Sequence, residues 1–307
     1  MFYDYAFDPP RVKQERFREE ESGVEVAAVQ MEPLLLEKES NLGRCLEYIS
    51  ACAEEGARLV VLPECVLTGI MFDSLEEAGP LMESVPGRST DTLARACMVH
   101  KVYVVAGMLE AASGRHYNTA VLVGPRGLIG RYRKTHLPFL GVDRFLDHGD
   151  APPEVYETEI GKIGMGICYD ILFPEHARTL ALKGAEIFAL PTNWPQQRVH
   201  IPEYVVPARA AENRMFVIAA NRVGVERGTR FLGRSIIAHC AAGEPLARGS
   251  LENEEVLYAR IDRERARQKH VVIAPGQFEF DLVRDRRPEL YGLLTKPVEA
   301  SSTEADA

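Results

Sequence analysis

Short apolar runs alternate with amphipathic helical stripes along this chain, and this alternation strongly limits the folds open to it. In the first half we expect strands at 24–29, 59–62, 102–108, 118–123 and 128–133, with helices at 40–55 and 90–100. The sequence GPRG between the last two runs is typical of a hairpin. Strands that alternate with helices predict an α/β fold in which helices cover the faces of sheets.

The second half of the chain repeats this order loosely. Here we expect strands at 163–168, 187–190, 216–220, 235–238 and 256–259, with helices at 174–183 and 203–214. No linker rich in Pro, Gly or Ser separates the halves, which favours one domain over residues 24–296. We interpret residues 1–23 as a charged N-terminal extension, without the apolar segment of a signal peptide, and residues 297–307 as a flexible tail.

Composition excludes several classes of protein. The 307 residues carry a formal net charge of −9, which argues against an unaided nucleic-acid or anionic membrane surface. No apolar run approaches the roughly 20 residues that span a bilayer. Six cysteines without paired CxxC spacing do not resemble a disulfide framework, so we expect reduced thiols and a cytoplasmic location.

Polar or reactive residues follow four of the expected strands. They are Glu64, Lys134, Cys168 and the pair Asn193 and Trp194. Ligands of α/β sheets bind beyond the carboxyl ends of strands, so these tips are candidates for one shared pocket.

Cys168 is the sharpest candidate because it lies between an apolar strand and a helix that begins near Pro174. Such a turn presents a nucleophile beside free backbone N–H groups. A buried structural cysteine is the competing interpretation, and we expect it for Cys45, Cys52, Cys97 and Cys240, with Cys65 left open. Glu64 is a candidate general base and Lys134 a candidate oxyanion stabiliser, although solvated loop residues remain the alternative for both.

Three motifs in order resemble the nitrilase superfamily of carbon–nitrogen hydrolases. Glu64 in LPECVLTG, Lys134 in YRKTHLP and Cys168 in GICYDILFPE are similar to the Glu–Lys–Cys triad of that family, and the resemblance runs from about residue 24 to 296. The resemblance implies an α-β-β-α sandwich and subunits that pair as a homodimer or higher oligomer. It also implies acyl transfer through a thioester, without a metal or cofactor, in which Lys134 and the Tyr169 backbone N–H hold the oxyanion.

Other residues follow from the same resemblance. Many members carry a second Glu after the lysine; here Asp143 is the nearest acid, with a simple loop aspartate as the competing interpretation. Asn193, Trp194, Phe139 and Tyr117 are expected to line the substrate pocket, against a core role for Trp194. Tyr169-Asp170 after the nucleophile resembles the amidase and ω-amidase-like branches.

The expected activity is therefore hydrolysis of a small non-peptide carboxamide to an acid and ammonia. An N-carbamoyl amino-acid hydrolase is the first alternative, and it needs a cation for the substrate carboxylate, for which Arg144 and Arg198 are candidates. Nitrile hydrolysis is the next alternative. An idle scaffold of the same fold, or a redox role for Cys168, represents a different class of function.

Overall fold

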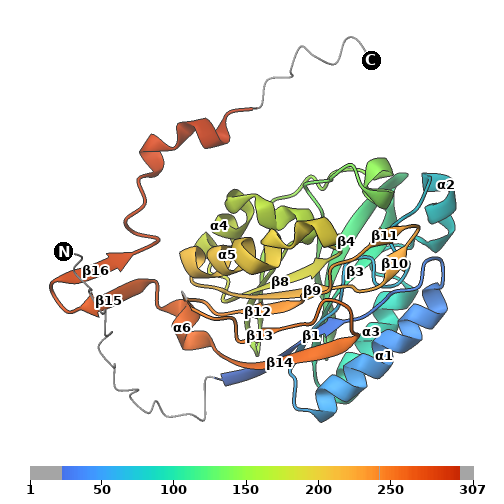
Figure 1. The fold of residues 1–307 in the computed structure, drawn as a ribbon, viewed down its shortest axis with the longest axis horizontal. Helices are drawn as coiled ribbons and strands as arrows, with labels where there is room; N and C mark the ends of the chain where they lie inside the picture. The colour runs from blue at the N-terminus through green and yellow to red at the C-terminus, as the bar shows by residue number, and fades with distance from the viewer. Residues whose placement is uncertain (1–22, 242, 298–307) are drawn as a thin grey trace, which may run out of the picture.

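Two six-stranded β-sheets form the centre of the computed structural model, which describes residues 23–241 and 243–297 (Figure 1). The first sheet has the order β14-β1-β2-β3-β4-β5. Its strands are β1 (Gly23–Gln30), β2 (Leu59–Val61), β3 (Tyr103–Ala112), β4 (Arg115–Gly124), β5 (Gly127–Arg133) and β14 (Glu255–Asp262). Strands β1, β2 and β3 are parallel, and the others pair antiparallel.

The second sheet has the order β13-β12-β9-β8-β7-β6 and also has three parallel strands in its middle, β7, β8 and β9. Its strands are β6 (Val155–Thr158), β7 (Gly161–Met165), β8 (Ile187–Thr192), β9 (Phe216–Asn221), β12 (Ile236–Ala238) and β13 (Ala247–Arg248). The central strands β2, β8 and β9 are buried along their whole length, as expected for parallel strands covered on both faces.

Helices cover the outer face of each sheet. The first sheet carries α1 (Lys38–Glu54) and α3 (Arg88–His100), and the second carries α4 (Pro174–Leu182) and α5 (Val206–Asn213) (Figure 1). One apolar core lies between α1, α3 and the first sheet, and a larger one joins the facing sheets with α4 and α5. The expected α-β-β-α sandwich is confirmed, and the structural cysteines Cys45, Cys52, Cys97 and Cys240 are buried as expected.

The strands expected at 102–108 and 256–259 extend further than expected, as β3 and β14, and two other elements differ in course. The strand expected at 163–168 ends at Met165, because the Ile167 N–H turns to the Asp170 carboxylate (2.9 Å) instead of a neighbouring strand. The helix expected at 203–214 begins as a π turn over Ile201–Val205 before α5. Pro207 explains this break, since it has no N–H for the Glu203 carbonyl.

The end of the described chain extends away from the sandwich as an arm (Figure 1). We define the arm as residues 270–295. It contains the hairpin of β15 (His270–Ala274) and β16 (Phe278–Asp281) and the short helices η6 (Pro288–Leu290) and η7 (Gly292–Thr295). Several of its apolar side chains are exposed, and Leu293 reaches 79%.

The remaining expectations about the chain ends stay predictions. The extension at 1–23 lies outside the described residues except for Gly23, and so does the tail at 297–307 except for residue 297. Within the described ranges, no helix has the length and apolar character needed to cross a bilayer.

Candidate active site

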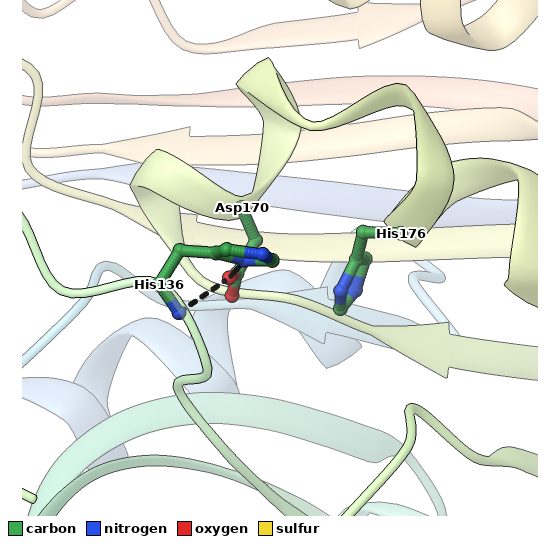
Figure 2. A group of neighbouring side chains, drawn as sticks. All are labelled: His136, Asp170 and His176. Atoms are coloured by element: carbon green, nitrogen blue, oxygen red, sulfur yellow. Dashed lines mark hydrogen bonds and ion pairs between the residues drawn. The ribbon is translucent and has the colours of Figure 1, made fainter. Parts of the chain in front are cut away.

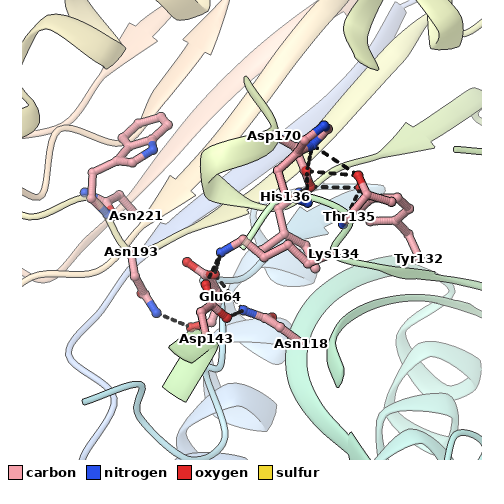
Figure 3. A network of polar contacts seen from close by, with 12 residues as sticks. Glu64, Asn118, Tyr132, Lys134, Thr135, His136, Asp143, Asp170, Asn193 and Asn221 are labelled. Atoms are coloured by element: carbon pink, nitrogen blue, oxygen red, sulfur yellow. Dashed lines mark hydrogen bonds and ion pairs between the residues drawn. The ribbon is translucent and has the colours of Figure 1, made fainter. Parts of the chain in front are cut away.

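A buried lysine lies between two buried carboxylates (Figure 3). Lys134 Nζ is 2.6 Å from Glu64 Oε1 and 2.6 Å from Asp143 Oδ2. Asn118 Nδ2 donates to Glu64 Oε1 (2.8 Å) and to Asp143 Oδ1 (2.9 Å), so it joins the two acids from the other side. The structure therefore brings Glu64 together with Lys134 and Asp143, which lie 70 or more residues further along the chain.

The first sheet places this cluster. Glu64 follows the end of β2, where its backbone presses against β3: a Cβ on Gly107 would lie 2.5 Å from the Glu64 Cα, so only glycine fits there. Lys134 directly follows β5, and its N–H donates to the Asn118 carbonyl on β4 (2.8 Å). Asp143 lies in the short helix η2 (Gly141–Phe145), beyond the lysine.

The second sheet supplies Cys168, the first residue of the short helix η3 (Cys168–Leu172). Its φ of +44° is in the left-handed region, which non-glycine residues rarely adopt outside tight functional turns. The thiol is buried and interacts electrostatically with both Glu64 and Lys134. The acid, the amine and the thiol thus share one site, contributed by both sheets.

Burial strongly affects the charges at this site. Burial, followed by the charge of Glu64, raises the pKa of the Cys168 thiol, while Lys134, the Thr192 hydroxyl and the Asn193 backbone N–H act against this rise. Burial acts to lower the pKa of Lys134, but the carboxylates of Asp143 and Glu64 outweigh it and raise that pKa well above its usual value. The amine is therefore charged, and the thiol needs a base to accept its proton.

Glu64 has the properties of such a base. Burial and the neighbouring Asp143 charge raise the pKa of Glu64, although Lys134 and Asn118 lower it. Its second oxygen, Oε2, is buried and has no hydrogen-bond partner within the described part of the chain. One oxygen thus anchors the carboxylate while the other stays available for a proton.

The other expected site residues lie in different surroundings. Asn193 is buried and its Nδ2 donates to the Glu64 carbonyl (2.9 Å), so it braces the acid. Trp194 is buried too, and its backbone N–H donates a hydrogen bond to Asn221 Oδ1 (2.8 Å). Its indole N–H has no hydrogen-bond acceptor among the described residues. Tyr169 lies in the first turn of η3, half-buried, with its ring edge-on to Phe173.

Phe139 and Tyr117 do not lie in the buried cluster. Phe139 is 90% exposed, and the guanidinium of Arg144 lies 5.8 Å from the centre of its ring. Tyr117 is buried on β4, where the Arg133 guanidinium lies 3.9 Å over its ring. Their expected role in lining the substrate pocket stays a prediction.

Sequence reasoning missed two residues of the site, Asn118 and Thr192. Both are fully buried polar residues at or near the ends of apolar strands. The available signal was an amide or hydroxyl inside an otherwise apolar run, because buried polar groups need partners.

A second cluster of His136, Asp170 and His176 lies beside the site (Figure 2). Their potential ligand atoms lie within 4.8 Å of one another, a spacing that could hold a metal ion. However, both Asp170 oxygens already accept hydrogen bonds, and His176 Nε2 lies 3.0 Å from the Met165 carbonyl, which accepts its proton. We therefore interpret this cluster as a hydrogen-bonded joint.

Comparison with known proteins agrees with this geometry. Residues 25–270 match the family model of the carbon–nitrogen hydrolases. A protein named nitrilase from Pyrococcus abyssi is 41% identical over 87% of this chain and 99% of its own length. The omega-amidase NIT2 of Xenopus tropicalis is 32% identical over 84% of this chain and 94% of its own length.

A solved amidase structure from Nesterenkonia sp. AN1 superimposes with a TM-score of 0.73 over 89% of this chain and 97% of its own, at 23% identity. That structure, of a mutant amidase, has the acetamide moiety of fluoroacetamide covalently added at its active-site cysteine. The chain belongs to the carbon–nitrogen hydrolase family. It is accordingly a hydrolase of carbon–nitrogen bonds other than peptide bonds, and the resemblance expected from its three motifs is confirmed.

Proposed function

We propose that this protein is a thiol amidohydrolase that cleaves a small carboxamide to a carboxylic acid and ammonia, with Cys168, Glu64 and Lys134 as its catalytic residues. The observation that carries the proposal is the shared burial of a thiol, a carboxylate with one free oxygen and a charged amine. A scaffold has no need for a buried lysine between two acids, because the desolvation penalty of buried charges can exceed what their pairing returns.

The first half-reaction forms a thioester. Glu64 takes the thiol proton, and the Cys168 sulfur attacks the amide carbon as the C=O electrons move to oxygen. Lys134 and the Tyr169 backbone N–H stabilise that oxyanion. The C–N bond then breaks, and Glu64 gives its proton to the departing nitrogen, which leaves as ammonia.

Water completes the reaction. Glu64 removes a proton from water, the hydroxide adds to the thioester carbon, and the C–S bond breaks to release the acid. Cys168 recovers its proton from Glu64. Asp143 and Asn118 hold Glu64 and Lys134 in place through both halves, and this role for Asp143 replaces the second glutamate of many family members.

An N-carbamoyl amino-acid hydrolase is the second candidate, and Arg144 favours it. Its guanidinium donates to the carbonyls of Gly141 (2.9 Å) and Phe72 (2.9 Å), and it pairs with no carboxylate within residues 23–241 and 243–297. A fixed cation one residue from Asp143 suits a substrate carboxylate. Both arginines are exposed, and Arg198, on a short helix after Trp194, is the weaker candidate because the two carbonyls hold only the Arg144 guanidinium. Nitrile hydrolysis is the third candidate.

Ammonia release from a panel of substrates tests the proposal. The panel comprises aliphatic amides, ω-amides, N-carbamoyl amino acids and nitriles, assayed with the parent and with Cys168→Ala. We expect the parent to release ammonia from an amide and Cys168→Ala to release none, whereas the matched control Cys240→Ala keeps the parent rate. Turnover by Cys168→Ala, or no turnover of any substrate by the parent, contradicts the proposal.

We also propose that the protein associates with itself and works in the cytoplasm. The exposed apolar residues of the arm support self-association, because many large apolar side chains exposed in one segment are typical of an interaction surface. The proposed partners are a small amide and further copies of this chain, with no nucleic acid, membrane, metal or cofactor.

A further inference from the structure

Asp170 is a fully buried carboxylate that the proposed mechanism does not use. Its two oxygens face donors from two separate segments, one that carries Cys168 and one that carries Lys134, and Figure 3 shows the contacts with the second segment. A buried charge with this many partners is unfavourable to form and strongly directional once formed. The positions of these donors therefore indicate which parts of the chain the Asp170 carboxylate holds together.

On the nucleophile side, Asp170 closes the turn around Cys168. Its Oδ2 accepts the Ile167 N–H (2.9 Å), while its own N–H donates to the Ile167 carbonyl (3.0 Å). The strand ladder stops one residue earlier, at the bond from Gly166 N–H to the Ala189 carbonyl. Asp170 thus replaces the sheet as the partner of the backbone just before Cys168 and supports its left-handed conformation.

On the lysine side, the same carboxylate holds the residues that flank Lys134. The Tyr132 hydroxyl donates to Oδ2 (3.0 Å), and His136 Nδ1 lies 2.6 Å from Oδ1 (Figures 2 and 3). The Thr135 hydroxyl is 2.9 Å from the Tyr132 hydroxyl, so the turn closes on itself. Donors two residues before and two residues after Lys134 therefore converge on one group.

The charge state fits this role. Burial acts to raise the pKa of Asp170, but the hydrogen bond from His136, the nearby His176 and the Ile167 N–H outweigh it, and the pKa is lowered. An ionised carboxylate only accepts, so His136 must carry its proton on Nδ1. His136 is kept in this orientation by the Phe173 ring, stacked at 3.7 Å between ring centres.

We propose that Asp170 is a positioning residue that sets the distance between the Cys168 sulfur and the Lys134 ammonium. The inference rests on the proposed function, because it assigns Asp170 to the geometry of that reaction. Asp170 touches neither substrate nor reacting atoms. It joins the two segments whose relative placement decides whether the oxyanion forms beside the amine.

Two variants of Asp170 test the proposal on the full-length protein. Asp170→Ala removes the joint, and we expect kcat to fall about 100-fold with KM changed less than about threefold, as for misplacement of reacting groups by an ångström. Asp170→Asn keeps an acceptor for Ile167 and Tyr132 and can donate to His136 in its other tautomer. We expect it to recover about tenfold of that loss.

Alkylation of Cys168 by iodoacetamide gives a readout without substrate. We expect Asp170→Ala to slow alkylation, measured by peptide mass and referred to Cys168→Ala as the blank. A folded Asp170→Ala that keeps parent kcat and parent alkylation overturns the inference while leaving the proposed function intact. Unchanged turnover in Cys168→Ala overturns the proposed function instead.

Tyr132→Phe keeps the test decisive if Asp170→Ala does not fold. Tyr132→Phe removes one of the donors to Asp170 on the lysine side, and the double variant with His136→Leu removes two. We expect kcat of the double variant to fall at least about tenfold at constant KM. Tyr156→Phe is the matched control, since its hydroxyl donates to the Arg131 carbonyl (2.9 Å) and not to Asp170. A double variant with the kcat of Tyr156→Phe overturns the inference.

Discussion

Lys134 shows how a single side chain can determine the chemistry of its neighbours. Because it contacts Glu64 and Asp143 at equal distance, its one positive charge is shared by two negative ones. The charges of Lys134 and Asp143 both act on the pKa of Glu64, so the pH dependence of the enzyme reflects the whole cluster and not one residue. Asp143 is the member that can be changed without removing a proposed catalytic group.

We expect Asp143→Asn to move the acidic limb of the pH profile of kcat/KM to lower pH. The Asp143 charge contributes to the raised pKa of Glu64, and removing it lets Glu64 lose its proton at a lower pH. We also expect a roughly tenfold loss of kcat near neutral pH, because Lys134 loses one of the two partners that hold it.

Asp147→Asn is the matched control for this prediction. Asp147 follows four residues later, where it pairs with Arg115 at the surface and accepts the His116 N–H. The two variants make the same chemical change on the same connecting segment. An acidic limb that moves upward in Asp143→Asn, or that moves equally in both variants, contradicts the assignment.

At the scale of elements, a buried glutamate fastens the loop that follows Glu64. Glu226 ends β10 (Val225–Glu226), and its Oε1 accepts the N–H groups of Ile70 (2.7 Å) and Met71 (2.6 Å). Its other oxygen pairs with the buried Arg222. The chain after β9 thereby holds the loop after β2, and one half of the molecule stabilises the active-site loop of the other.

We expect Glu226→Gln to destabilise the protein by about 3 kcal/mol in urea unfolding, because it leaves Arg222 as an uncompensated buried charge. Glu254→Gln makes the same change at a more exposed pair with Arg44 and should cost no more than about 1 kcal/mol. An equal loss of unfolding free energy in the two variants would show that the burial of the ion pair does not determine the destabilisation.

At the scale of the whole molecule, the arm (residues 270–295) is a segment that does not pack into the sandwich. It carries exposed apolar residues and extends from the body (Figure 1). We expect the triple change of Leu290, Leu293 and Leu294 to Asp to reduce the oligomer observed in sedimentation at micromolar concentration. Val225→Asp, at an exposed apolar residue on β10, should leave it unchanged. A parent that sediments as a monomer contradicts the prediction.

The sandwich was predictable because periodicity is a local property. Each run of apolar residues marks a strand or a helix wherever it later packs, so β2, β8 and β9 were located to within one or two residues. Glu64, Lys134 and Cys168 followed from motifs at strand ends. Their meeting in one site needed the coordinates, because it depends on how two sheets face each other.

The supporting residues were not predictable for the same reason. The joint at Asp170 depends on Tyr132 and His136, more than 30 residues away, and no local pattern marks such a hydrogen bond. The end of β7 at Met165 was missed because the apolar run continues to Ile167 while the backbone already turns. Long-range polar contacts thus set the details that apolar patterning leaves open.

The left-handed backbone of Cys168 implies a conflict between durability and activity at that position. An L-residue in this region is disfavoured by roughly 1–2 kcal/mol, whereas glycine is not. Cys168→Gly should therefore resist urea better than Cys168→Ala, although neither can turn over substrate. The sequence keeps a residue there that disfavours the observed backbone conformation. The rest of the fold must therefore be stable enough to hold a cysteine at a position where glycine would be more stable.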